Sequence, residues 1–151
     1  MKTNFNQQAQ NMTGMQRLKA YEQQGERHGM AANLGYTLGE CELGNVTLNY
    51  SPKERHMNLI GSLHGGILAS LLDTAMGCAV MTHLEVGEKH TMTDLNTKFI
   101  RAVMDSEEQL IIVGRVEHPG RRLLATEGTI HNQDGKMKPI ATALSPKQTR
   151  R

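Results

Sequence analysis

The sequence contains no tryptophan and few aromatic residues of any kind, with two phenylalanines and three tyrosines among 151 residues. Charge of one sign is lacking too, because 17 basic side chains are scattered among 15 acidic ones and the net charge is +2. A nucleic-acid-binding domain carries a basic stripe or patch, often with aromatic side chains on which bases stack. The composition therefore argues against nucleic acid as a partner.

Cysteine is equally scarce. The two cysteines, Cys41 and Cys78, are too few for a disulfide framework, and Cys78 lies in an apolar stretch where a thiol acts as a small hydrophobic side chain. The first 14 residues are polar and lack the apolar segment of a secretory signal. Both features favour a reducing, cytoplasmic location.

Long hydrophobic runs are also missing. The longest run, Ile67 to Met81, is interrupted by Asp73 and falls short of the ~20 residues that a membrane-spanning helix needs. We therefore expect no membrane contact. The chain is long enough for one domain with its own core. We assign residues 31–151 to that domain and residues 1–30 to an N-terminal extension with a short helix near 12–26.

The spacing of apolar residues predicts an α+β domain. Residues 34–52 alternate apolar and polar side chains around a glycine-containing turn, which predicts a β-hairpin. Residues 64–84 are apolar on nearly every side, which is typical of a buried helix. The rest of the chain predicts antiparallel strands within residues 91–103, 108–118, 121–132 and 135–145. One long helix among antiparallel strands implies a sheet wrapped around that helix.

Two glycines, Gly65 and Gly66, follow His64 where the predicted helix begins. The first N–H groups of a helix have no acceptor within it and carry partial positive charge, so this position could bind an oxyanion or a phosphate. The two glycines could instead serve only a tight turn into the helix. The residues alone leave both interpretations open.

Asp73 presents a similar choice, because a carboxylate within a buried helix costs free energy unless something uses it. The residues one helical turn away are mostly small: Ala69, Ser70, Met76 and Gly77. They leave room for a ligand beside the carboxylate, but Asp73 could also fix the packing by pairing with a polar group. It lies about 13 Å along the helix from His64. The N-terminus of the same helix therefore cannot serve it.

Common catalytic signatures are absent. The seven histidines show neither an H-E-x-x-H pattern nor paired Cys/His spacing, so no metal site is expected. There is no P-loop, no G-x-G-x-x-G and no G-x-S-x-G motif. Any chemistry must then come from asparagine, histidine, aspartate, hydroxyl groups and the backbone.

The combination of Asn58, His64-Gly65-Gly66 and Asp73, followed by Thr93-Asp94-Leu95-Asn96, resembles the hotdog-fold acyl-CoA thioesterases of the phenylacetic-acid-degradation (PaaI-like) branch. The resemblance covers about residues 34–144. It implies an antiparallel sheet wrapped around a long central helix. It also implies a homodimer whose sheets join edge to edge, often a homotetramer as a dimer of dimers, with an active site that spans two subunits.

The resemblance further implies hydrolysis of an acyl- or aryl-acyl-CoA thioester, with coenzyme A as part of the substrate and with no metal or redox cofactor. Asp73 of one subunit would be the general base or the nucleophile. Asn58, His64 and Gly65 would come from the other subunit. Asn58 would position the water or nucleophile, His64 would orient the carbonyl, and the Gly65 N–H would stabilise the oxyanion. The hydroxyl that the family often adds nearby would be Thr93, with Thr91 as the alternative.

Further substrate contacts are expected at Gly66 and Ser70, and at three basic side chains near strand ends that could grip nucleotide phosphates: Arg101, Arg121 and Arg122. The arginines could equally form a solvated basic edge that deters sheet aggregation. Two other functions stay open. The first is a non-catalytic acyl-CoA-binding protein, although such a protein has no need of an ionisable acid beside a thioester. The second is a dehydratase acting on acyl-carrier-protein thioesters, although a dehydratase would place its histidine and acid differently.

Overall fold

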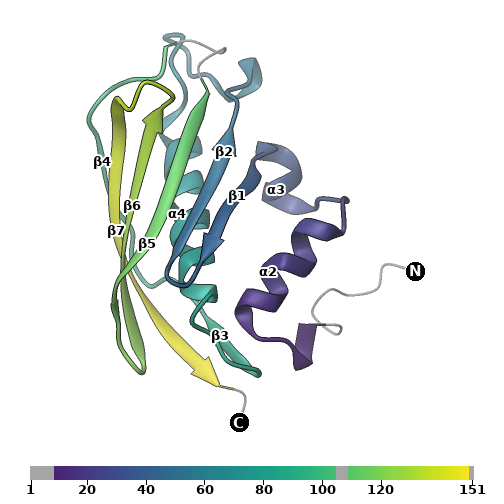
Figure 1. The fold of residues 1–151 in the computed structure, drawn as a ribbon. Helices are drawn as coiled ribbons and strands as arrows, with labels where there is room; N and C mark the ends of the chain where they lie inside the picture. The colour runs from purple at the N-terminus through teal and green to yellow at the C-terminus, as the bar shows by residue number, and fades with distance from the viewer. Residues whose placement is uncertain (1–8, 105–108, 150–151) are drawn as a thin grey trace.

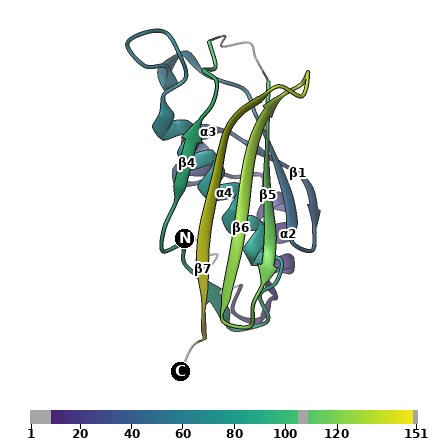
Figure 2. The same cartoon turned by 90° about the vertical axis from the view of Figure 1, so that its left-hand side faces the viewer.

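A computed structural model describes residues 9–104 and 109–149 of the chain, with the backbone alone for residues 137–142. An antiparallel sheet curves around one long helix, α4 (Gly65–Met81), as Figures 1 and 2 show from two sides. The sheet and the helix match the α+β architecture predicted from the sequence. The apolar core lies between them.

Within the described residues the sheet has seven strands, six of which follow the order β1-β2-β5-β6-β7-β3, while β4 also pairs with β7. Their bounds are β1 (Thr37–Glu42), β2 (Asn45–Tyr50), β3 (Glu88–His90), β4 (Asn96–Phe99), β5 (Leu110–Pro119), β6 (Leu123–Asn132) and β7 (Met137–Thr149). The long strand β7 pairs with β4 over residues 139–142 and with β3 over residues 147–149. Both short strands therefore share one neighbour.

The predicted hairpin and the strands after residue 108 are confirmed, although β7 extends four residues beyond the predicted end. Within residues 91–103 only β4 is a strand. The residues before it form a loop instead, because the Thr93 N–H donates to the carbonyl oxygen of Leu144 (3.1 Å) and Asp94 Oδ1 accepts the Leu144 N–H (2.8 Å). Four short elements were not predicted: η1 (Ala9–Asn11), α3 (Gly29–Leu34), η2 (Glu54–His56) and β3.

Helix α2 (Gly14–Gln23) confirms the helix predicted near residues 12–26. It begins at a capping box, in which the Thr13 side chain accepts the Gln16 N–H and the Gln16 side chain accepts the Thr13 N–H. The Gly14 N–H donates to the carbonyl oxygen of Leu84 (2.8 Å), just past the end of α4. Helix α2 is thus packed on the domain. The proposed domain boundary between residues 30 and 31 stays a prediction.

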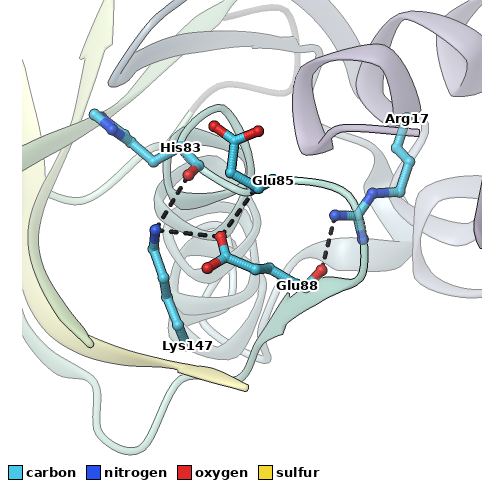
Figure 3. A network of polar contacts seen from close by, with 5 residues as sticks. All are labelled: Arg17, His83, Glu85, Glu88 and Lys147. Atoms are coloured by element: carbon cyan, nitrogen blue, oxygen red, sulfur yellow. Dashed lines mark hydrogen bonds and ion pairs between the residues drawn. The ribbon is translucent and has the colours of Figure 1, made fainter. Parts of the chain in front are cut away.

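A polar network joins α2 to the sheet (Figure 3). Arg17 donates to the backbone oxygen of Glu88 on β3 (2.9 Å), and the Glu88 carboxylate forms an ion pair with Lys147 on β7 (3.3 Å). Lys147 also donates to the backbone oxygen of His83 (3.3 Å). The network fixes the C-terminal end of α4, β3 and α2 relative to one another.

Helix α4 is buried only on the side that packs on the sheet, where seven side chains lie in the core: Leu68, Leu71, Leu72, Ala75, Met76, Ala79 and Val80. Asp73 is only partly covered in the single chain. The prediction that the helix is buried on nearly every side therefore needs correction, because the side that carries Asp73 is left uncovered. No helix in the described part of the chain is long and apolar enough to cross a membrane.

Candidate active site

His64 forms the N-cap of α4. Its Nδ1 accepts the N–H of Gly66 at 2.9 Å, which places the proton of the neutral ring on Nε2. The N–H of Gly65 has no acceptor among the described residues. A Cβ at position 65 would lie 3.2 Å from the ring of Phe99 on β4, so a larger residue would press against that ring. The helix therefore begins with one capped and one free N–H group.

Asn58 holds the loop that leads to His64. Its Oδ1 accepts the N–H groups of Ile60 and Ser62, both at 3.0 Å, and its Nδ2 donates to Ser62 Oγ at 2.7 Å. The Asn58 side chain is thus engaged within its own loop. One N–H of its amide group has no partner among the described residues and is the only donor that it could offer to a ligand.

A cavity of about 470 Å³ opens beside this loop, lined by Met57, Asn58, Leu59, Ile60 and His64. In the single chain Leu59 is fully exposed and Ile60 is 81% exposed. Phe99 and Ile100 at the end of β4 are also more than half exposed. The end of the molecule at which α4 begins therefore presents apolar side chains that its own core does not cover.

Asp73 lies in a different cavity, of about 320 Å³, together with Met30, Ala69, Ser70, Thr74 and Leu95. Its carboxylate forms no hydrogen bond or ion pair with any described residue. Partial burial raises the pKa of this carboxyl above its usual value. The structure thus offers no polar partner of the kind required if Asp73 served only to fix the packing.

The chain does not bring Asp73 to His64, Gly65 or Asn58. Asp73 lines one cavity, whereas Asn58 and His64 line another, with Gly65 next to His64 at the start of α4. Asp73 lies more than two helical turns from His64, about 13 Å by helical rise.

The remaining predicted contacts are placed as follows. The Ser70 hydroxyl lines the Asp73 cavity and donates to the backbone oxygen of Gly66 at 2.8 Å. The Thr93 hydroxyl donates to the backbone oxygen of Leu144 at 3.3 Å, in the loop that brings Leu95 to the same cavity. Thr91 is exposed in that loop.

The three arginines lie at opposite ends of the sheet. Arg101 follows Phe99, which pairs with Pro139 of β7, whereas Arg121 and Arg122 precede Leu123, which pairs with Pro146. Seven residues of β7 separate the two positions, roughly 23 Å. All three side chains are exposed. One chain therefore cannot use them together on one phosphate group.

Met30, which lines the Asp73 cavity, and Phe99, which lies beside Gly65, are among the residues near the site that were not predicted. Met30 lies on α3, which is too short to show a helical repeat, and the exposed position of Phe99 over Gly65 follows from the pairing of β4 with β7. A buried polar pair was missed as well. Tyr50 Oη lies 2.7 Å from His56 Nδ1, and the backbone oxygen of His56 accepts the His64 N–H.

Comparisons with known proteins identify the family of the chain. The sequence matches the family described as Thioesterase superfamily over residues 60–138, more than half of the chain. Human acyl-coenzyme A thioesterase 13 is 29% identical over 108 residues, which are 68% of this chain and 76% of the human protein.

Solved structures share the architecture, which is the hotdog fold. The PaaI protein of the E. coli phenylacetic acid degradation operon superposes with a TM-score of 0.78 at 21% identity, over 89% of this chain and 94% of that one. A Streptococcus mutans protein solved with bound acetyl CoA superposes with a TM-score of 0.70 at 22% identity, over 77% of this chain and 90% of that one.

Proposed function

Because this chain belongs to the thioesterase superfamily and is a thioester hydrolase, we propose that it hydrolyses acyl- or aryl-acyl-CoA thioesters to the free acid and coenzyme A. The similar human protein is named as an acyl-coenzyme A thioesterase, and one protein of similar fold was solved with acetyl CoA. Both support coenzyme A esters as the substrate class.

The observation that carries the proposal is the state of Asp73. Its carboxylate lies in a cavity, has no hydrogen-bond partner among the described residues, and has a pKa raised by partial burial. A raised pKa moves a carboxylate toward the range in which it can accept a proton near neutral pH. A residue that only stabilised the fold would be expected to have a partner.

The donors at the start of α4 supply the other half of the reaction. The thioester carbonyl would accept the free N–H of Gly65 and the Nε2–H of His64, which stabilise the negative charge that develops on its oxygen. Asp73 would take a proton from the attacking water or attack the carbonyl itself. The bond between the carbonyl carbon and sulfur then breaks, and coenzyme A leaves as the thiolate, which can take up the proton released from water. If Asp73 has attacked the carbonyl, a second step follows, in which water hydrolyses the mixed anhydride to the free acid and restores the carboxylate. This reaction needs no metal or redox cofactor.

The site becomes complete when a second copy brings its Gly65 and His64 to Asp73. Strand β4 has β7 as its only partner among the described strands, so its other edge is free to extend the sheet. The exposed apolar side chains at this end of the molecule fit a subunit interface: Leu59, Ile60, Phe99 and Ile100. We therefore propose a homodimer, with a homotetramer as the larger assembly.

Finer roles follow from the same arrangement. Asn58 would hold the loop before His64 and could offer one amide N–H to the attacking water. Thr93 would shape the loop beside Asp73. In a two-fold dimer, opposite ends of the two sheets can meet, so the partner's arginines could join Arg101 at one phosphate. We also propose a cytoplasmic location, in which Cys41 and Cys78 stay free thiols, as they are in the structure.

The test is thiol release from short-, medium- and long-chain acyl-CoA and phenylacetyl-type CoA thioesters by wild type and Asp73→Asn. We expect the variant to lose at least about a hundredfold in rate while it stays folded and equally oligomeric. Asp134→Asn, an exposed aspartate in the β6–β7 turn, is the matched control and should keep full activity. If wild type binds acyl-CoA but releases no thiol from any thioester, the protein is an acyl-CoA-binding protein instead.

A further inference from the structure

We propose that Met30, on the short helix α3, determines which lengths of acyl chain the enzyme accepts. The inference rests on the proposed function, since it places the acyl chain of the thioester in the cavity beside Asp73. Met30 lies outside the part of the chain that matches the family, residues 60–138. The assignment of Met30 therefore does not come from a family motif.

The cavity beside Asp73 has a floor and two walls. Ala69, Ser70, Asp73 and Thr74 form one face of α4 and make the floor. Met30 and Leu95 make the walls, and they come from α3 and from the loop before β4. Among the residues that the structure describes, no lysine, arginine or histidine lines this cavity. It therefore suits the apolar acyl group of the substrate better than the phosphates of coenzyme A.

Met30 is not needed for the core of its own chain. Its side chain is 52% exposed, whereas Ala31 and Leu34 of the same helix are buried in the core. Helix α3 thus uses two side chains to pack on the domain and directs a third one into the Asp73 cavity. Truncating Met30 should then change the cavity with little effect on folding.

Helix α3 is held in place on both sides. Before it, Arg27 donates to the backbone oxygen of Tyr36 and its guanidinium lies 5.8 Å from the centre of the Tyr36 ring. Near its end, Arg55 donates to the backbone oxygen of Asn33 (2.6 Å), and His56 Nε2 lies 3.4 Å from Asn33 Oδ1. The wall that Met30 forms therefore has a fixed position. Chain length would be limited by the size of the side chain at position 30.

The opposite wall is fixed in the same way, because Asp94 next to Leu95 is bound to the backbone of β7. Methionine is flexible and polarisable and adapts to apolar groups of varied shape. The Asp73 cavity would therefore accept a range of apolar acyl chains up to the length at which Met30 blocks further extension.

The experiment measures kcat/KM over straight-chain acyl-CoA thioesters of increasing length for wild type, Met30→Ala and Met30→Phe. We expect Met30→Ala to shift the preferred length upward and Met30→Phe to shift it downward, each changing the ratio of long to short substrates by about tenfold. Val86→Ala is the control, because Val86 is equally exposed (53%) but lies in the loop between α4 and β3, away from the cavity.

Binding of S-alkyl-CoA thioethers, which cannot be hydrolysed, separates this inference from the proposed function. If wild type hydrolyses no thioester, the proposed function fails, and the chain-length dependence of thioether affinity still tests Met30. If Met30→Ala and Met30→Phe keep the wild-type length profile in both hydrolysis and binding, as Val86→Ala should, the assignment of Met30 is wrong. A general loss of activity at all lengths without a shift of preference would also overturn it.

Discussion

Gly114 lies directly opposite Gly128 on the neighbouring strands β5 and β6, at the place where α4 crosses the sheet. A Cβ on Gly114 would lie 2.1 Å from the backbone oxygen of Ala75 on α4. A Cβ on Gly128 would lie 3.0 Å from the side chains of Leu72 and Met76. The pair of glycines lets the helix backbone approach the sheet closely. This close packing fixes the distance between the sheet and α4, the helix that carries Asp73.

The two glycines should differ in their tolerance of alanine. Gly114→Ala would force backbone against backbone, and we expect it to lower the free energy of unfolding by about 3 kcal/mol or more. Gly128→Ala meets only side chains that can change rotamer, so its cost should be clearly smaller. Urea unfolding followed by circular dichroism compares the two variants. Equal costs would show that the contact between α4 and β5 can relax.

The fold was predictable where side-chain periodicity is strong. The helix of residues 65–81 and the long strands β5 and β6 follow from their apolar patterns and from the turns between them. The glycine pair was not recognised, because a close approach of backbones leaves no periodic signal in the sequence. Helix α3 was missed for a related reason, since six residues complete fewer than two helical turns.

For the candidate site, the sequence predicted the residues on and next to α4 and the distance between them, but not the residues that form the walls of the cavity. Asp73, His64 and Gly65 stand out because a charge interrupts an apolar helix and two glycines begin it. Their separation in the single chain was foreseen from the helical rise. The walls of the cavity were not, because Met30 and Leu95 are ordinary apolar residues whose position depends on tertiary hydrogen bonds at Asn33 and Asp94.

Asp73→Asn should reduce activity without reducing stability. Burial raises the folded pKa of Asp73 above the ordinary value of 3.8, so ionisation is less favourable in the folded than in the unfolded chain. The protonated form thus favours folding at low pH, and this contribution is lost as the pH rises through the folded pKa. At neutral pH the uncharged asparagine side chain should leave the protein as stable as wild type or more stable.

Thermal unfolding from acid to neutral pH checks this sign. The advantage of the asparagine variant should shrink as the pH falls through the folded pKa and vanish below 3.8, where wild type is protonated in both states. The rate of thioester hydrolysis by wild type should fall over the same acid range, because the active form of Asp73 is the carboxylate. A variant that is less stable at neutral pH would mean that Asp73 has a stabilising partner in the assembled protein.

His64 should have two separable roles, as the cap of α4 and as a donor to the thioester carbonyl. His64→Ala removes both, and we expect it to lose about 1 kcal/mol of stability and about a hundredfold in kcat. His64→Asn restores a side chain that can accept the Gly66 N–H, since asparagine is a preferred N-cap residue. It should therefore recover the stability but not the rate. If His64→Asn also recovered the rate, His64 would act only as the N-cap of α4 and not as a donor to the thioester carbonyl.

Subunit complementation tests whether the two cavities belong to one site. Asp73→Asn and His64→Asn chains, each inactive alone, are co-expressed in equal amounts. If every site takes its acid from one subunit and its donors from the other, a mixed dimer holds one intact site and one doubly altered site. Half of random dimers are mixed, so about one quarter of wild-type activity should return.

The reciprocal mixture makes the result decisive. When wild type is co-expressed with a chain that carries both substitutions, a site shared between subunits is intact only in wild-type homodimers, which gives about one quarter of full activity. A site contained in one chain would instead give about one half, and the two single variants would then not complement each other at all. Because Asp73 and His64 line separate cavities, we expect complementation in the first mixture and one quarter of the activity in the second.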